Sequence, residues 1–310
     1  MKPSPKSLIT ALVGVLALAG FAPLALGTPL VKPVAVIWGY ADGSVFSNPR
    51  GIAFDPIDGA IYVADTDNHQ IEAFSKTGRR LGRSVHRVTT SEGVVDGNPC
   101  ALAFDRSGRL LVADQRVLYV DVMDRRARSV ARLETPGGHP NALAVAKDGT
   151  IYVGTTAEQS RIYRFGADYR PIDSWGDQGA EAGRLFGVTA LGVLGDTAIA
   201  VACGRTDLGI QIFSPAGKYL RGFGAHDVGD GNVSMPSGVV VTTQGRLWVA
   251  DEIRESIQIF DQEGNYVGKA GQSGVSPGEF SHPSSLAFDG RGLIALTDRG
   301  IGRVQVLAIQ

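Results

Sequence analysis

The chain has 310 residues, of which 44% are hydrophobic, and a formal net charge of −1 from 30 Lys and Arg residues against 31 Asp and Glu residues. This near balance removes any general electrostatic reason to bind nucleic acid, so we expect no nucleic-acid partner. The apolar content is sufficient for a complete hydrophobic core, and stabilisation by disulfides or structural metals is not required.

The first 27 residues have the features of a secretory signal peptide. Two lysines precede the apolar stretch Leu8–Leu26, which Pro23 interrupts, and Gly27 supplies a small residue at the expected cleavage position. The alternative is an uncleaved membrane anchor of marginal length, which would be the only contact with a membrane. In both cases we expect residues 28–310 to form one domain outside the cytoplasm, either secreted or periplasmic.

Residues 48–81 contain three short strands separated by turns. Apolar runs at 51–54, 61–65 and 71–74 alternate with polar turn residues, and Asp58-Gly59 is a strong hairpin signal between the first two runs. Such a small meander cannot bury both of its faces alone. The unit therefore needs neighbours that pack against it.

The unit occurs six times along the chain. The residues that end the second strand of each copy lie 41 to 49 residues apart, and they are Asp65, Asp114, Thr155, Cys203, Asp251 and Asp298. Five copies start their first strand directly after a proline, and the fourth copy has Val188 at this place. A repeat of this length without helical patterns is typical of a β-propeller.

The two ends of the chain are expected to form one blade together. The sixth copy stops at Gln310, at the end of its third strand, whereas residues 34–39 read as a fourth strand with no blade of their own. An N-terminal strand that completes the last blade would close the ring and remove exposed sheet edges. The predicted fold is therefore all-β: a six-bladed β-propeller of four-stranded blades, with the N-terminal strand closing the last blade.

The repeat resembles the NHL repeat. The resemblance rests on P-x-G-I-A-F-D, then D-G-x-I-Y-V-A-D-T-x-N-H-x-I, then F-x-x-x-G; residues 48–81 match nearly throughout, and 236–271 match well. In looser form it covers residues 31–310. It implies a six-bladed propeller, and because this fold hosts many unrelated functions it implies little about activity.

The recurring aspartates Asp65, Asp114, Asp251 and Asp298 are interpreted as structural. A carboxylate after a strand accepts hydrogen bonds from nearby backbone N–H groups and fixes the adjoining turn. Repetition at one position of four copies fits a requirement of the fold, and His69 in the same turn is interpreted in the same way.

The loops that lead into the innermost strands are the predicted functional region, because variation on a rigid scaffold is where function usually lies. Their candidate ligand-binding residues are Asn48, Arg50, Asn98, His139 and His282. His139 and His282 are three copies apart, so they should face each other across the channel mouth, where imidazoles and amides could hold a metal or an anionic ligand. The alternative is that each His-Pro pair only packs or hydrogen-bonds within its own loop.

Enzymes with NHL-like propellers provide a second hypothesis. Lyases that cleave peptidyl-hydroxyglycine use three histidines on zinc, but only His139 and His282 occupy such loops here. Lactonase-type propellers use a Glu/Asn/Asp calcium site, and their Glu-Gly-Pro opening is replaced by Ser47–Gly51. Without a complete catalytic set, the leading hypothesis is a ligand- or protein-binding or sensing scaffold, expected to be a monomer. The alternative is a metal-dependent lyase or hydrolase that uses zinc or calcium.

Two further features are interpreted conservatively. Cys100 and Cys203 fall two copies apart around the ring, too far for a disulfide. The arginine-rich stretches 79–87 and 125–132 are interpreted as solvated outer edges, with a basic rim that meets an acidic partner as the alternative. His86 lies in the first of these stretches.

Overall fold

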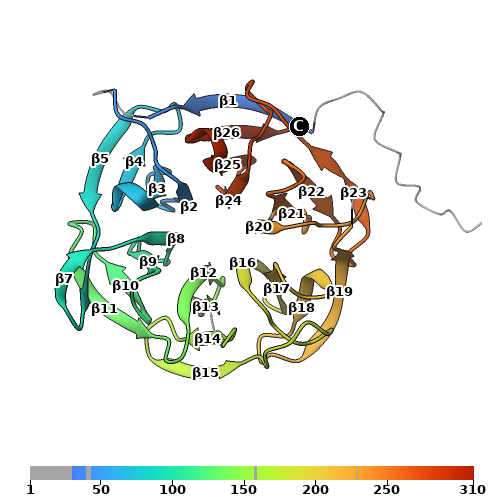
Figure 1. The fold of residues 1–310 in the computed structure, drawn as a ribbon, viewed down its shortest axis with the longest axis horizontal. Coiled ribbons are helices and arrows are strands. Elements are labelled where there is room, and N and C mark those ends of the chain that lie inside the picture. Colours follow the sequence, from blue (N-terminus) through green and yellow to red (C-terminus); the bar gives the residue numbers. More distant parts are fainter. Residues whose placement is uncertain (1–29, 40–42, 157–158, 228) are drawn as a thin grey trace, which may run out of the picture.

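A computed structural model describes residues 30–39, 43–156, 159–227 and 229–310. Six four-stranded antiparallel sheets surround a central axis like the blades of a propeller, as Figure 1 shows. The predicted fold is confirmed. The predicted signal peptide, residues 1–27, lies outside the described residues, and within them no helix is long and apolar enough to cross a membrane.

Each blade runs from an innermost strand outward. Blade 1 consists of β2 (Pro49–Phe54), β3 (Ile61–Asp65), β4 (Gln70–Phe74) and β5 (Arg80–Val85). Blade 2 consists of β8 (Pro99–Phe104), β9 (Leu110–Asp114), β10 (Tyr119–Met123) and β11 (Ser129–Glu134). Blade 3 consists of β12 (His139–Val145), β13 (Ile151–Thr156), β14 (Ile162–Phe165) and β15 (Pro171–Trp175).

The second half of the ring repeats this order. Blade 4 consists of β16 (Val188–Leu194), β17 (Ala198–Cys203), β18 (Leu208–Phe213) and β19 (Tyr219–Ala225). Blade 5 consists of β20 (Pro236–Val241), β21 (Leu247–Asp251), β22 (Ser256–Phe260) and β23 (Tyr266–Ala270). Blade 6 consists of β24 (Pro283–Phe288), β25 (Leu293–Asp298), β26 (Arg303–Ile309) and β1 (Val31–Ile37).

The ring is closed as the sequence predicted. Strand β1 pairs antiparallel with β26, with Val31 opposite Ile309 and Ile37 opposite Val304 (Figure 1). Ile37 is buried in a cluster that also contains Phe74 of blade 1, so this strand joins the last blade to the first. The strand begins three residues earlier than the predicted one.

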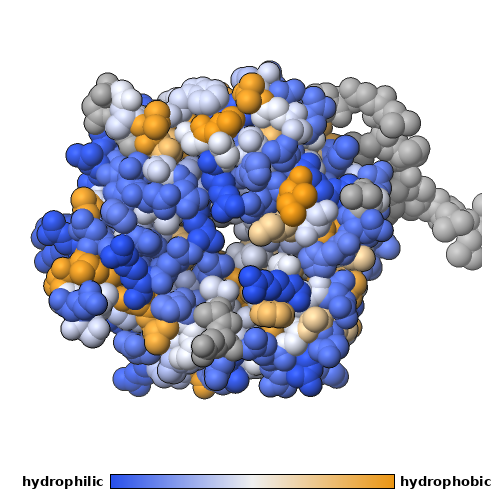
Figure 2. Space-filling view, viewed as in Figure 1, coloured by the Kyte–Doolittle hydropathy of each residue, from blue (hydrophilic) through white to orange (hydrophobic). Residues whose placement is uncertain are grey.

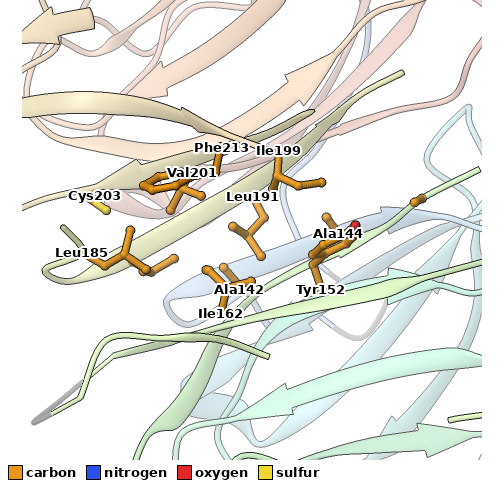
Figure 3. Close-up of a cluster of buried hydrophobic side chains, with 12 residues drawn as sticks. Ala142, Ala144, Tyr152, Ile162, Leu185, Leu191, Ile199, Val201, Cys203 and Phe213 are labelled. Carbon is orange, nitrogen blue, oxygen red and sulfur yellow. The ribbon is translucent and has the colours of Figure 1, made fainter. Parts of the chain in front are cut away.

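The core lies between neighbouring blades. Tyr152 and Ile162 of blade 3 pack with Leu191, Val201 and Phe213 of blade 4, all of them buried (Figure 3). The second strand of each blade has neighbours on both sides and is therefore almost continuously apolar. Each blade thus supplies half of two interfaces, which is why one repeat cannot fold alone.

One element departs from the repeat. A two-stranded arm, β6 (Arg87–Thr90) and β7 (Gly93–Asp96), lies between blades 1 and 2 and was not predicted. Val88 of this arm is buried against Val117 and Tyr119 of blade 2. The arm therefore packs on the ring and changes how the chain approaches β8.

The arginine-rich stretches are largely neutralised by carboxylates. Arg80 pairs with Glu72, Arg125 with Asp55 and Arg128 with Asp124. The interpretation of a solvated edge holds for these arginines, but it is wrong for His86, which is buried beneath the arm. Cys100 and Cys203 are both buried and free, so the prediction of no disulfide is confirmed.

Candidate functional site in the central channel

A β-bulge occurs near the start of the innermost strand in all six blades. The pairing with the second strand shifts directly after the proline, or after Val188 in blade 4. A bulge adds one residue to a strand and redirects its side chain. The bulged residues, which we call the channel ring, are Arg50, Cys100, Asn141, Thr189, Ser237 and Ser284.

All six side chains of the channel ring line one cavity on the central axis, with a volume of about 160 Å³. Met235, Glu252 and Arg299 contribute to its lining from the loops at the same end of the channel. In Figure 2 the molecule is hollowed at its centre, and hydrophilic residues border much of the hollow. Apolar residues of the six innermost strands also line the cavity.

Four members of the channel ring donate hydrogen bonds to the next blade. Each bond ends on the backbone carbonyl of the residue that precedes that blade's bulge. The pairs are Cys100 Sγ to Pro140 (3.5 Å), Asn141 Nδ2 to Val188 (2.9 Å), Thr189 Oγ1 to Pro236 (2.6 Å) and Ser237 Oγ to Pro283 (2.6 Å). The ring thus satisfies backbone acceptors that the bulges remove from the sheet ladder.

Arg50 does not take part in this pattern. In blade 1 the corresponding bond to the Pro99 carbonyl comes from Thr66 Oγ1, at 2.8 Å. The Arg50 side chain instead reaches towards blade 3, where Nη2 lies 3.4 Å from Asn141 Oδ1. Among the described residues no carboxylate forms an ion pair with Arg50, so the channel holds a cation without a counter-charge.

The other charged residues of the cavity neutralise each other. Glu252 follows β21, and Arg299 begins the short helix η2 (Arg299–Ile301) after β25. Their side chains form an ion pair between blades 5 and 6. The net charge of the cavity lining therefore comes from Arg50 alone.

Buried aspartates hold the loops that lead into the channel. In three blades the aspartate that ends the second strand accepts a hydrogen bond from the backbone N–H two residues before the proline. The pairs are Ser47 to Asp65 (2.7 Å), Ser234 to Asp251 (2.6 Å) and Ser281 to Asp298 (2.7 Å). This confirms their predicted structural role and fixes where the channel ring starts.

In blade 2 the loop that leads into the innermost strand is held differently, because the arm precedes it. The backbone N–H of Gly97 donates to the carbonyl of His86, and His86 Nε2 lies 3.5 Å from Asp114 Oδ2. A Cβ atom at Gly97 would stand 2.1 Å from that carboxylate oxygen, so only glycine fits. Burial lowers the pKa of His86, whereas the nearby Asp114 and Asp121 act in the opposite direction.

Comparison with known families agrees with this architecture. Residues 46–74 match the NHL repeat family, and residues 232–304 match a family described as a 6-bladed beta-propeller. The chain contains an NHL repeat and folds as a six-bladed β-propeller. No curated protein matches its sequence.

Solved structures similar to this NHL propeller include several enzymes. A gluconolactonase from Xanthomonas campestris has 18% identity and a TM-score of 0.63, over 91% of this chain and 96% of that one. A virginiamycin B lyase from Staphylococcus aureus has 13% identity and a TM-score of 0.60, over 85% and 96%. A luciferin-regenerating enzyme has 13% identity and a TM-score of 0.68, over 91% and 95%. At these identities the similarity shows the fold alone.

The predicted site residues of the NHL propeller divide into two groups. Arg50 lines the cavity, whereas Asn48, Asn98, His139 and His282 are not among the residues that line it. The Nδ2 group of Asn48 donates to Asp67 Oδ1 at 3.2 Å in its own blade. The side-chain oxygen of Asn98 is buried without a hydrogen-bond partner.

The two histidines lie in opposite blades, as predicted, but each has a local neighbour. His139 Nδ1 lies 3.2 Å from the carbonyl oxygen of Val117. His282 Nδ1 lies 3.5 Å from Glu255 Oε1, and its side chain is half exposed. Within the described ranges no three His, Cys, Asp or Glu side chains cluster as metal ligands. Among the described residues, neither histidine therefore belongs to a set of three such side chains, which a catalytic zinc would need.

Of the six residues of the channel ring, the sequence predicted only Arg50. The other five directly follow the proline, or Val188 in blade 4, that starts each innermost strand, whereas the other predicted site residues lie before it. A signal was present: Cys100, Asn141, Thr189, Ser237 and Ser284 are small or polar residues at one position of otherwise apolar strands. The repetition of small or polar residues at one position of the innermost strands indicates a shared role in the channel.

Proposed function

We propose that this propeller is an extracytoplasmic binding or sensing scaffold that holds a small-molecule ligand in its central channel. The observation that carries the proposal is the convergence of six bulged side chains, one from each blade, on one cavity that contains the unpaired cation Arg50. A cavity with a few convergent polar groups on an apolar wall is typical of ligand sites. All six blades come from one chain, which supports a monomer as the functional unit.

Binding is favoured over metal-dependent catalysis by the chemistry of the lining. Among the described residues that line the cavity there is no histidine, and the one carboxylate, Glu252, is held by Arg299. General acid–base catalysis needs a titratable group within reach of the substrate, and an ion-paired carboxylate is poorly suited to that task. The similarity to lactonase and lyase structures supports the shared fold, not a shared activity.

The proposed location rests on the N-terminal sequence. The apolar stretch Leu8–Leu26 behind two lysines supports export through a signal peptide. Intact mass of the protein recovered outside the cytoplasm should correspond to a chain that starts at Thr28. A mass that retains residues 1–27 in a membrane fraction would favour the anchor.

The proposal is tested by a thermal-shift screen of small molecules against the purified protein. Met235, which is partly exposed and lines the cavity, is replaced by tryptophan to narrow the channel. The matched control is Val94→Trp on the exposed face of the arm. We expect ligands that raise the melting temperature of the wild type and of the control but not of Met235→Trp. Ligands that stabilise all three proteins equally would contradict a site in the channel.

A further inference from the structure

The net positive charge of the cavity lining favours an anionic ligand. Arg50 is the one charged side chain of the described lining without an ion-pair partner, because Glu252 and Arg299 pair with each other. Its contact with Asn141 is a long one, 3.4 Å from Nη2 to Oδ1, and a stronger acceptor can replace it. A guanidinium offers parallel N–H donors whose geometry matches a carboxylate.

Two hydroxyl groups of the channel ring, those of Thr189 and Ser237, are oriented as acceptors towards the channel. A hydroxyl has one hydrogen, and those of Thr189 and Ser237 are directed at the carbonyls of Pro236 and Pro283, at 2.6 Å each. Their oxygens therefore offer only lone pairs to a molecule in the channel. A ligand that satisfies them must donate hydrogen bonds.

The donors of the ligand are hydroxyl groups rather than ammonium groups. An ammonium would need a carboxylate near it, and Glu252 is already engaged by Arg299. It would also be repelled by Arg50 within the same small cavity. Neutral O–H donors satisfy the same acceptors without this cost.

The two kinds of group come from different blades. Arg50 belongs to blade 1, but its guanidinium reaches Asn141 of blade 3, whereas Thr189 and Ser237 belong to blades 4 and 5. A small molecule in the channel would have its anionic end at this guanidinium and its hydroxyl groups at blades 4 and 5. The cavity of about 160 Å³ restricts it to a small molecule.

We infer that the ligand is a small hydroxy acid, with one carboxylate bound by Arg50 and hydroxyl groups that donate to Thr189 and Ser237. This inference rests on the proposed function, since it names the ligand class of that same channel. It also explains why blade 1 alone has a long cationic side chain at the bulge: Thr66 has taken over the backbone bond, and this leaves Arg50 free for a ligand.

The inference is tested with three four-carbon probes that differ only in the relevant groups. L-threonate has a carboxylate and hydroxyls, butyrate has the carboxylate alone, and erythritol has hydroxyls alone. Affinities are measured by ligand-observed NMR titration with the wild-type protein. We expect threonate to bind about tenfold or more tightly than either of the other two, because each lacks one set of hydrogen bonds. Equal affinity for threonate and erythritol, or no binding of threonate, would overturn the inference.

Two variants test which residue binds the carboxylate of the ligand and which binds its hydroxyl groups. Arg50→Ala should weaken both threonate and butyrate by about tenfold or more, since a charge-assisted bond is lost. Thr189→Val keeps the side-chain shape but removes the acceptor, so it should weaken threonate by about threefold to tenfold and leave butyrate unchanged. Arg79→Ala, an exposed arginine in a turn of blade 1, is the control and should change nothing. Threonate affinity that survives Arg50→Ala would contradict the assignment.

Failure of the inference can be separated from failure of the proposed function. Neutral ligands that Met235→Trp blocks and Arg50→Ala does not affect would overturn the hydroxy acid and retain the channel as the binding site. Ligands that are insensitive to Met235→Trp would overturn both. Circular dichroism and the melting temperature of each variant confirm that it is folded before its affinity is used.

Discussion

His86 Nε2 lies 3.5 Å from Asp114 Oδ2, and only 1% of each side chain is exposed. This pair joins the arm to blade 2, at the place where other blades use a backbone N–H as the donor to the equivalent aspartate. The two ring nitrogens of His86 have no hydrogen-bond partner of good geometry. Protonation of His86 would therefore place a charge on a buried ring that forms no hydrogen bond.

The first prediction concerns pH. Burial lowers the pKa of His86 in the folded protein, so the unfolded chain binds a proton more readily. The stability from a neutral His86 is complete above the unfolded pKa of about 6.5 and decreases as the pH falls through that value. Urea unfolding from pH 8 to pH 5 should show a smaller loss of stability for His86→Gln than for the wild type.

The control for this prediction is His226→Gln. His226 is exposed, and its Nδ1 lies 2.9 Å from the carbonyl oxygen of Ser234. This variant should follow the wild type at every pH. A free-energy difference between the wild type and His86→Gln that stays constant with pH would contradict the assignment.

The second prediction concerns the buried ion pair of blade 6. Arg303 Nε lies 2.9 Å from Asp298 Oδ2, and both side chains are fully buried. Asp298→Ala leaves the buried Arg303 with only backbone carbonyls as partners and also removes the acceptor of the Ser281 N–H, so it should reduce the free energy of unfolding by about 3–5 kcal/mol. Asp96→Ala breaks the exposed pair with Arg87 and should cost at most about 1 kcal/mol. Equal losses in the two variants, measured by urea unfolding, would show that burial of the pair is unimportant.

The third prediction concerns closure of the ring. Ile37 on β1 is buried between blades 6 and 1, whereas Val34 on the same strand is half exposed. Ile37→Ala should reduce the free energy of unfolding by about 2–5 kcal/mol, because it leaves a cavity at the closing strand. Val34→Ala should change it by less than about 0.5 kcal/mol. Similar small effects of both changes would mean that β1 contributes little to the closed ring.

The fold was predictable because each of the six repeats must bury its faces against neighbouring repeats. A strand pattern that recurs with Asp65, Asp251 and Asp298 at one position is compatible with few folds. The incomplete last repeat and the extra N-terminal strand indicate how the ring closes. The arm was missed because β6 and β7 are mostly exposed, so their hydrophobic pattern is weak. His86 was misread for the same reason, since its burial depends on this arm.

The site was harder to predict because it depends on strand register. Residues before the prolines were chosen from their variation, yet His139 and Asn48 have neighbours in their own loops. The residues after the prolines reach the cavity only because each strand bulges there, and a bulge is a property of pairing between strands.

The fourth prediction concerns the two cysteines. Burial raises the pKa of Cys100 and that of Cys203 to about 12 each, so the reactive thiolate is scarce at pH 8. Native protein treated with iodoacetamide should gain almost no adduct, whereas urea-unfolded protein should gain two without prior reduction. A requirement for reductant would reveal a disulfide, and fast modification of Cys100 in the native state would show that the channel opens more widely.

The most direct test of the account is the position of a bound ligand in the channel. A crystal structure of the protein with the tightest ligand from the thermal-shift screen should show it inside the channel ring, with an anionic group against Arg50 and hydroxyl groups near Thr189 and Ser237. A ligand bound on the outer edge of a blade, above an empty channel, would contradict the central claim.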